Sequence, residues 1–271
     1  MRPLIDNIVA AVKRRGGRME LEAFRKLIQK TRDSLFEDVD TLTELVIASG
    51  VPIEIVGEEV VLKTYFRPWR EETFCIVDIE TNGSVPNRSQ IIEIGALKWR
   101  NGEIVDRFES FAACSYLPYN ISEITGIMPE DLADAPPLAK MLPRFKAFLG
   151  DTVFVAHNIS FDYNFVSHSF ERFGLGVLGN RKLCTIELAR RTIEAERYGL
   201  GHLNIALDIN TLVHHRAYAD ALTASKVLEI GLKRVPESVV TTEELIDFTK
   251  MPVKRAKALL NNGEWRMENG E

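Results

Sequence analysis

Acidic residues end an apolar stretch of this sequence in a way that suits metal binding. Asp78 and Glu80 lie at the end of the nearly all-apolar run 74–79. In a strand, residues two apart point to the same side, about 6 to 7 Å apart along the backbone. Carboxylates at the end of a buried strand are costly unless a cation neutralises them, and paired oxygens suit a hard divalent metal. The spacing alone also fits two acids in a solvated loop.

Two further aspartates lie on the apolar stripes of predicted helices. Asp162 falls on the stripe of a helix over 160–173, and Asp220 on that of a helix over 217–233. An acid in a first turn also favours the helix N-terminus, which is the simpler interpretation of each residue taken singly. His215 precedes Asp220 by five residues, in the loop that enters the helix, where an imidazole could reach a substrate.

Four carboxylates and one histidine would converge if these elements pack together. Like charges at that density repel one another unless cations are shared among them. Two Mg²⁺ or Mn²⁺ ions would resolve the conflict, and such a pair is standard machinery for in-line attack on a phosphodiester. The combination therefore predicts a two-metal site.

The elements that must position these residues form a mixed α/β pattern over 73–236. Beside the strand 74–79, the pattern predicts a hairpin of 91–99 and 104–111 about Asn101-Gly102, a helical stretch 129–149 and a strand 152–156. Residues 1–66 predict a separate module of three helices and a hairpin about Gly57-Glu58, and residues 237–271 a short helical tail.

The N-terminal module resembles a winged helix-turn-helix, a fold that binds DNA or docks protein. Its balance of 10 basic and 11 acidic residues, a net charge of −1, leaves both uses open. The whole chain of 271 residues has a net charge of −5, which argues against broad electrostatic wrapping of nucleic acid. It has no apolar run long enough for a membrane span, so we expect a cytoplasmic protein without a membrane partner.

The order of the acidic motifs resembles a known family. Asp78-x-Glu80, His157-Asn158-x-x-Phe161-Asp162 and His215-x-Ala217-x-x-Asp220 are similar to the three motifs of the DEDDh 3′–5′ exonucleases. The resemblance covers about 73–236 and implies an α/β, ribonuclease H-like fold with a mixed central sheet. Within that family, the chain is most similar to the proofreading epsilon subunit of bacterial replicative DNA polymerase.

The resemblance implies a role for each site residue. Asp78, Glu80, Asp162 and Asp220 would hold two divalent metal ions, Mg²⁺ or Mn²⁺, and neutral His215 would take the proton of the attacking water. The terminal nucleotide would be contacted by residues beside the motifs, namely Ile79, Thr81 and Phe161. The product would be a nucleoside 5′-monophosphate released from a single-stranded or frayed DNA 3′ end.

Three functions remain open at this point. The first is a proofreading exonuclease held by a DNA polymerase catalytic subunit. The second is a DEDDh exoribonuclease that trims short RNA or RNA 3′ ends, and the third is an inactive module that binds nucleic acid or protein. Complete motifs count against the third, and the additional segments 1–66 and 237–271 favour the first.

Overall fold

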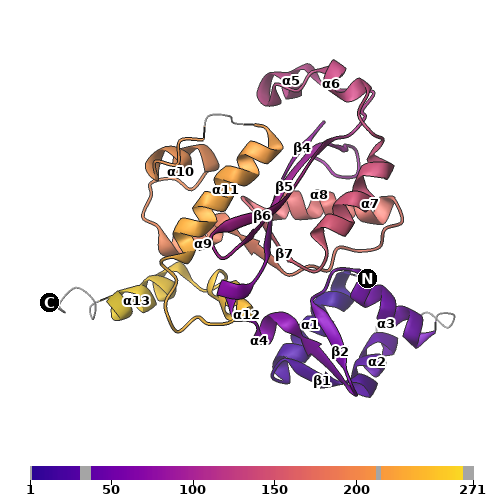
Figure 1. Ribbon diagram of the computed structural model, residues 1–271, viewed down its shortest axis with the longest axis vertical. Helices are drawn as coiled ribbons and strands as arrows, with labels where there is room; N and C mark the ends of the chain where they lie inside the picture. The colour runs from indigo at the N-terminus through magenta and orange to yellow at the C-terminus, as the bar shows by residue number, and fades with distance from the viewer. Residues whose placement is uncertain (1, 31–37, 212–214, 265–271) are drawn as a thin grey trace.

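A five-stranded sheet forms the centre of the molecule (Figure 1). The computed structural model describes residues 2–30, 38–211 and 215–264. The strand order is β6-β5-β4-β7-β8, and the bounds are β4 Phe74–Thr81, β5 Ile91–Arg100, β6 Glu103–Phe111, β7 Val153–Ala156 and β8 Lys182–Cys184. Strands β4, β5 and β6 are antiparallel neighbours, whereas β4, β7 and β8 run parallel. The sheet is therefore mixed, as predicted.

Helices cover both faces of this sheet. They are α5 Tyr119–Thr125, α6 Pro129–Ala133, α7 Leu138–Leu149, α8 Ile159–Arg172, α9 Thr185–Thr192, α10 Leu200–Ala206 and α11 Ala217–Leu232. Val77 of β4 packs into a core with α7 and α8, and Ile76 packs on the opposite face with α9 and α11. Because side chains alternate along a strand, Asp78 and Glu80 lie on the α11 face.

Several local predictions are confirmed, and others need correction. The hairpin predicted about Asn101-Gly102 is present, and its turn has positive φ at both Asn101 (50°) and Gly102 (87°), as a type I′ turn requires. The helical stretch 129–149 is divided into α6 and α7, because two prolines, Pro136 and Pro137, interrupt the backbone hydrogen bonding between them. Helices α5, α9 and α10 and strand β8 were not predicted; none has more than eight residues.

The N-terminal module has a core of its own. Its elements are α1 Arg2–Arg14, β1 Arg18–Glu20, α2 Leu21–Lys30, α3 Val39–Ala48, β2 Ile53–Val56, β3 Glu59–Leu62 and α4 Lys63–Phe66. Ile8, Phe24, Ile28 and Val46 pack together inside it. Helices α1, α2 and α3 and the hairpin were predicted, but the four-residue α4 and β1, which makes a three-stranded sheet of order β1-β3-β2, were not. Only Met19 of that short strand is buried, so it leaves no clear periodic pattern.

The C-terminal segment forms α12 (Thr242–Phe248) and α13 (Val253–Glu264). A capping box begins α12, since the Thr241 side chain accepts from the Glu244 backbone and the Glu244 side chain accepts from the Thr241 backbone. This segment also pairs with the residues between the module and the sheet, where a 3₁₀ turn spans Trp69–Glu71. The Trp69 indole donates to the Val239 carbonyl at 2.8 Å. The segment that connects the N-terminal module to β4 therefore packs against residues of the C-terminal segment.

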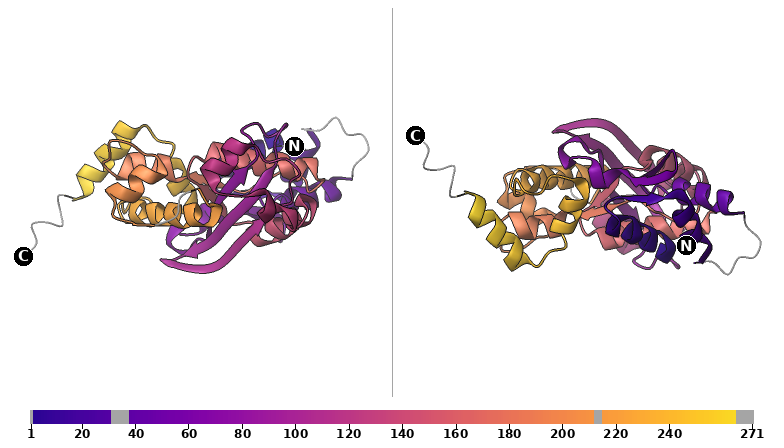
Figure 2. Two further views of the ribbon diagram at one scale, coloured as in Figure 1. Left: turned by 90° about the horizontal axis from the view of Figure 1, so that it is seen from above. Right: turned by 90° about the horizontal axis from the view of Figure 1, so that it is seen from below.

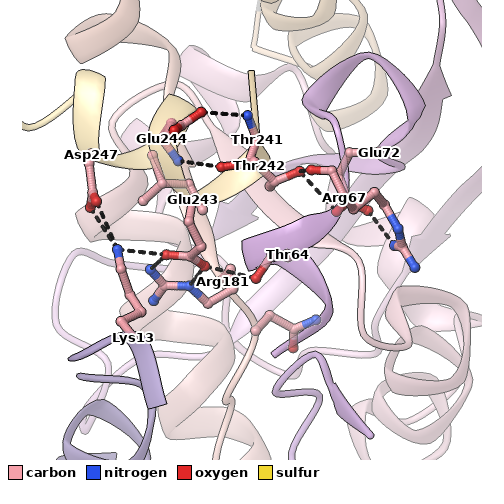
Figure 3. A network of polar contacts seen from close by, with 12 residues as sticks. Lys13, Thr64, Arg67, Glu72, Arg181, Thr241, Thr242, Glu243, Glu244 and Asp247 are labelled. Carbon is pink, nitrogen blue, oxygen red and sulfur yellow. Dashed lines mark hydrogen bonds and ion pairs between the residues drawn. The ribbon is translucent and has the colours of Figure 1, made fainter. Parts of the chain in front are cut away.

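A buried carboxylate on α12 joins three parts of the chain (Figure 3). Glu243, 2% exposed, accepts from the Arg181 Nε and Nη2 atoms at 2.6 and 2.7 Å. Its second oxygen also lies 2.9 Å from the Lys13 Nζ of α1, and its first accepts from the Thr64 hydroxyl of α4 at 2.8 Å. Helix α12 thus ties the N-terminal module to the sheet, while α13 lies away from the module (Figures 1 and 2). Within the described residues, no helix combines the length and apolar character needed to cross a membrane.

Candidate active site

The acidic pair of β4 lies where the sheet becomes irregular. Glu80 pairs with Glu93 of β5, but the next residue, Thr81, pairs with Ile91, so the register shifts directly after Glu80. Such bulges bend a strand and re-aim its side chains, and they occur often beside active sites. Asp78 and Glu80 both keep partial exposure on the α11 face of the sheet. The strand therefore presents two carboxylates beside the first turn of α11.

Asp162 reaches β4 from the first turn of α8. This helix begins after Asn158, whose φ of 74° turns the chain sharply at the end of β7. The Asp162 carboxylate, 3% exposed, accepts hydrogen bonds from its own backbone N–H and from that of Ile79. The bond to Ile79 places Asp162 next to the strand that carries Asp78 and Glu80.

Asp220 and His215 come from the start of α11. Asp220 is 8% exposed, and its Oδ2 atom accepts from the His215 backbone N–H at 2.9 Å. His215 is exposed and has a φ of 62°, a left-handed conformation that turns the chain into the helix. Glu80, His215 and Asp220 each present one possible ligand atom, and these atoms lie within 4.8 Å of one another. All five residues predicted for catalysis thus come from the adjoining ends of β4, α8 and α11.

The electrostatics of this cluster favour a cation. Burial, with the neighbouring charges of Asp162, Asp220 and Glu80, raises the pKa of Asp78 well above its usual value. Burial, followed by the charges of Glu93, Asp220 and Asp162, raises the pKa of Glu80 to about 8. Burial also raises the pKa of Asp162 to about 8, despite its two backbone hydrogen bonds. A raised pKa means that the surroundings offer too little positive charge to stabilise the ionised carboxylates. A divalent cation would supply that charge, and carboxylate oxygens are the ligands that Mg²⁺ and Mn²⁺ prefer.

The residues predicted to contact a nucleotide have different environments. Thr81, 7% exposed, donates its hydroxyl to the Gly83 carbonyl at 2.8 Å. Phe161 is half-buried and packs on Phe165, with ring centroids 4.9 Å apart. The Ile79 side chain is 4% exposed and lies in the core with α8, so a contact with substrate would come from its backbone. Their roles toward substrate stay predictions.

Glu93 was not identified as a site residue from the sequence. It is 1% exposed, stands opposite Glu80 in the sheet and bonds the first residues of α11. The available signal was an acid inside the apolar run 91–97. That signal marks a buried acid, but it does not identify the partner, because Arg216 is 123 residues away.

A mixed sheet with an acidic cluster at the end of its central strand defines an α/β domain suited to metal-assisted hydrolysis. Residues 75–228 match the family RNase T, described as exonuclease. This match covers more than half of the 271 residues, so the chain belongs to that exonuclease family, as its DEDDh motifs predicted. The family is one of enzymes.

Individual relatives extend this result. A PolC-type DNA polymerase III of Staphylococcus aureus is 38% identical over 179 residues, which make up 65% of this chain but only 12% of that polymerase. Exonuclease X, solved in complex with 5′-overhanging duplex DNA, is 26% identical with a TM-score of 0.50, over 65% of this chain and 99% of its own. The zinc-bound form of an E. coli ExoI–ssDNA complex has a TM-score of 0.53 at 20% identity, over 62% of this chain and 42% of its own, and supports the fold alone.

Proposed function

We propose that this protein is a cytoplasmic, metal-dependent 3′–5′ exonuclease that hydrolyses DNA 3′ ends to nucleoside 5′-monophosphates. The observation that carries the proposal is the meeting of Asp78, Glu80 and Asp162 with Asp220 and His215 in a chain of the exonuclease family. Raised pKa values show that the chain itself does not neutralise these acids fully. Two Mg²⁺ or Mn²⁺ ions held by the four carboxylates would do so.

The proposed chemistry divides the work among the residues of the site. When bound, the divalent ions would supply Lewis-acid stabilisation of charge in an in-line phosphodiester displacement. Asp78, Glu80, Asp162 and Asp220 hold the oxygen ligands in place through β4, α8 and α11. Exposed His215 takes a proton from the attacking water, because its ring lies beside Glu80 and Asp220 at the open side of the cluster. The Thr81 hydroxyl and the Phe161 ring, beside the acids, orient the terminal nucleotide.

The proposed role is proofreading for a DNA polymerase catalytic subunit. Support comes from the PolC-type polymerase whose similar stretch forms 12% of a much longer chain. The substrate would be a single-stranded or frayed 3′ end, because the acids would have to approach one phosphodiester from several sides. Trimming of RNA is the alternative that the assay below must decide. An inactive binding module is disfavoured, since all five residues that we propose for catalysis lie at the adjoining ends of β4, α8 and α11.

We further propose that the N-terminal module has a winged-helix fold that docks protein. Helix α3 and the β2–β3 hairpin are the elements with which such folds approach DNA. Between Asp38 and Leu62, however, the sequence has six acidic residues and neither lysine nor arginine. A surface of that charge repels phosphates, so DNA reading by these elements is disfavoured.

The test is a degradation assay on matched oligonucleotides. DNA and RNA of identical sequence, labelled at either the 3′ or the 5′ end, are incubated with Mg²⁺, with Mn²⁺ or with EDTA. We expect the 3′ label to leave first as a mononucleotide, faster from DNA than from RNA, and only with metal present. Release of the 5′ label first, or hydrolysis in EDTA, would contradict the proposal, and a preference for RNA would establish the alternative.

A further inference from the structure

Glu93 is a buried acid that lies beside the catalytic cluster but is bonded elsewhere. Its Oε1 atom accepts from the Nη2 and Nε atoms of Arg216 at 3.1 and 3.3 Å. Its Oε2 atom accepts from the Ala217 backbone N–H at 3.2 Å. Both oxygens are therefore engaged by the start of α11, which sets Glu93 apart from the proposed metal ligands.

These bonds cap α11 from another element. Arg216, the residue before the helix, makes no capping bond with its own side chain. The carboxylate of β5 takes that place, at the end of the helix where negative charge is favourable. Gly95, two residues further along β5, lets the helix approach: a Cβ atom there would lie 2.0 Å from the Tyr218 nitrogen. Glu93 and Gly95 thus set how the first turn of α11 sits on the sheet.

Arg216 is held between two groups. On one side Glu93 accepts its hydrogen bonds, and its guanidinium carbon lies over the Phe111 ring, 5.1 Å from the ring centre. Its side chain is 38% exposed, yet its donors point to Glu93. A stacked, twofold-bonded guanidinium has little freedom, so it suits holding the backbone better than following a substrate.

The position of the catalytic residues depends on this start of the helix. His215 directly precedes Arg216, and its backbone N–H bonds Asp220. The Asp220 N–H in turn bonds the Arg216 carbonyl at 3.0 Å. These two bonds hold His215, Arg216 and Asp220 together as one turn, and Glu93 attaches that turn to the sheet. A shift at Arg216 would therefore move His215 and Asp220 together relative to Glu80.

We propose that Glu93 and Arg216 are positioning residues that place His215 and Asp220 against the acids of β4. This inference rests on the proposed function, because it concerns the same site. Displacements of about 1 Å in a catalytic group can cost on the order of 100-fold in rate. Loss of either partner should therefore slow hydrolysis while leaving binding of a short oligonucleotide nearly unchanged.

The experiment is a set of double-mutant cycles on the full chain. Glu93→Gln, Arg216→Gln and the control Lys226→Gln are each made alone and with His215→Ala. The control removes an exposed pair of the same helix, Lys226 with Glu229, at 3.2 Å. Initial rates give kcat and KM on a short single strand with Mg²⁺, and melting curves verify the fold. If Glu93→Gln does not fold, Arg216→Gln still tests the inference, because it removes the same ion pair from the other side.

We expect Glu93→Gln and Arg216→Gln to lower kcat by about 10- to 100-fold with little change in KM. In these backgrounds, His215→Ala should cost far less than in the wild type, because the imidazole is already misplaced. Lys226→Gln should change neither quantity. Equal losses from His215→Ala in all backgrounds, with an active wild type, would overturn this inference alone. An inactive wild type would overturn the proposed function as well.

Discussion

The acids at the end of β4 and the cluster of Glu243 on α12 with Arg181 and Lys13 have opposite electrostatics. At the end of β4, burial raises the pKa of Glu80 and of Asp162 to about 8. On α12, burial acts in the same direction on Glu243, but bonds and charges from Arg181 and Lys13 lower its pKa to about 2. The type of residue and the degree of burial are similar. The difference is whether the chain supplies the cation.

This contrast separates a structural use of buried acids from a catalytic one. Glu243 is bonded both to Lys13 of the N-terminal module and to Arg181 directly before β8, and therefore stabilises one arrangement of α12, the module and the sheet (Figure 3). The acids of β4 and α8 are disfavoured in their charged forms by burial and by the charges of neighbouring acids, and only a cation from solution would neutralise them fully. The same desolvation that weakens the metal-free fold strengthens the attraction for a divalent ion.

The largest expected effect is on hydrolysis. Asp162→Asn removes a charged ligand oxygen from the site, and metal-ion catalysis is worth several kcal/mol of transition-state stabilisation. We expect the rate with Mg²⁺ to fall by roughly a thousandfold or more. The metal-free protein should melt at the same or a higher temperature, because the neutral amide replaces a carboxyl group whose charged form is disfavoured by burial. The matched control is Asp247→Asn on α12, which should keep the wild-type rate. A near-normal rate for Asp162→Asn would show that the acids of β4 and α8 are not used for catalysis and so do not differ in function from Glu243.

The second effect is on stability. Glu243→Gln leaves Arg181 and Lys13 without their shared carboxylate, and breaking a buried pair costs roughly 3 to 5 kcal/mol. We expect a loss of that size in the free energy of unfolding from urea denaturation, with hydrolysis by the folded protein unchanged. Glu229→Gln, which removes a partner from exposed Lys226 and Lys233, should cost less than about 1 kcal/mol. Equal losses from the two substitutions would show that Glu243 stabilises the fold no more than an exposed ion pair does.

The third effect is on how stability varies with pH in EDTA. Glu80 has a pKa of about 8 in the folded chain against an ordinary 4.5, so its favourable contribution is complete below 4.5 and is lost as the pH rises through 8. Glu243 has a pKa of about 2, so its contribution is complete above 4.5 and is lost as the pH falls toward 2. Melting temperatures should thus decline at both ends. Glu80→Gln should flatten the upper decline only, and an unchanged upper decline in that variant would refute the assignment.

The smallest expected effect is that of removing the N-terminal module on chemistry. No residue of the candidate site lies in 1–66, so the remaining chain should keep most of its hydrolysis of short single strands. Its melting temperature should fall, because Glu243 loses Lys13 and Thr64. A truncated protein that folds but has lost all activity would show that the module acts on the site itself.

The proposed catalytic set was accessible to sequence reasoning because its signals are local. Asp78 and Glu80 share a face by strand alternation, and Asp162 and Asp220 interrupt apolar helix stripes. Each signal depends on a few neighbouring residues. The strands 74–79 and 152–156 and the N-terminal helices were predicted for the same reason, from apolar patterns within single elements, whereas the mixed arrangement of the sheet was implied by the resemblance to the DEDDh exonucleases.

The remaining features depend on contacts between distant segments. Glu243 reads as an ordinary first-turn acid of α12, whereas its partners Lys13 and Arg181 are far away in the sequence. The tail was therefore predicted as an appendage rather than as a connection between module and sheet. Glu93 was passed over likewise, since only the folded register brings it opposite Glu80. Strand β8 has three residues, too few for any period to show.

The raised pKa values predict that the acids of β4 and α8 hold protons at pH 7 in the absence of metal and release them when a divalent ion binds. Calorimetric titration of the metal-free protein with Mn²⁺ at pH 7, in buffers of different ionisation enthalpy, counts the protons released on binding. Glu80 and Asp162, each with a pKa of about 8, should together release about one proton or more per protein. Asp162→Asn should bind more weakly and release fewer, while Glu243→Gln should match the wild type. Binding without proton release, or no binding at all, would contradict the proposed metal site.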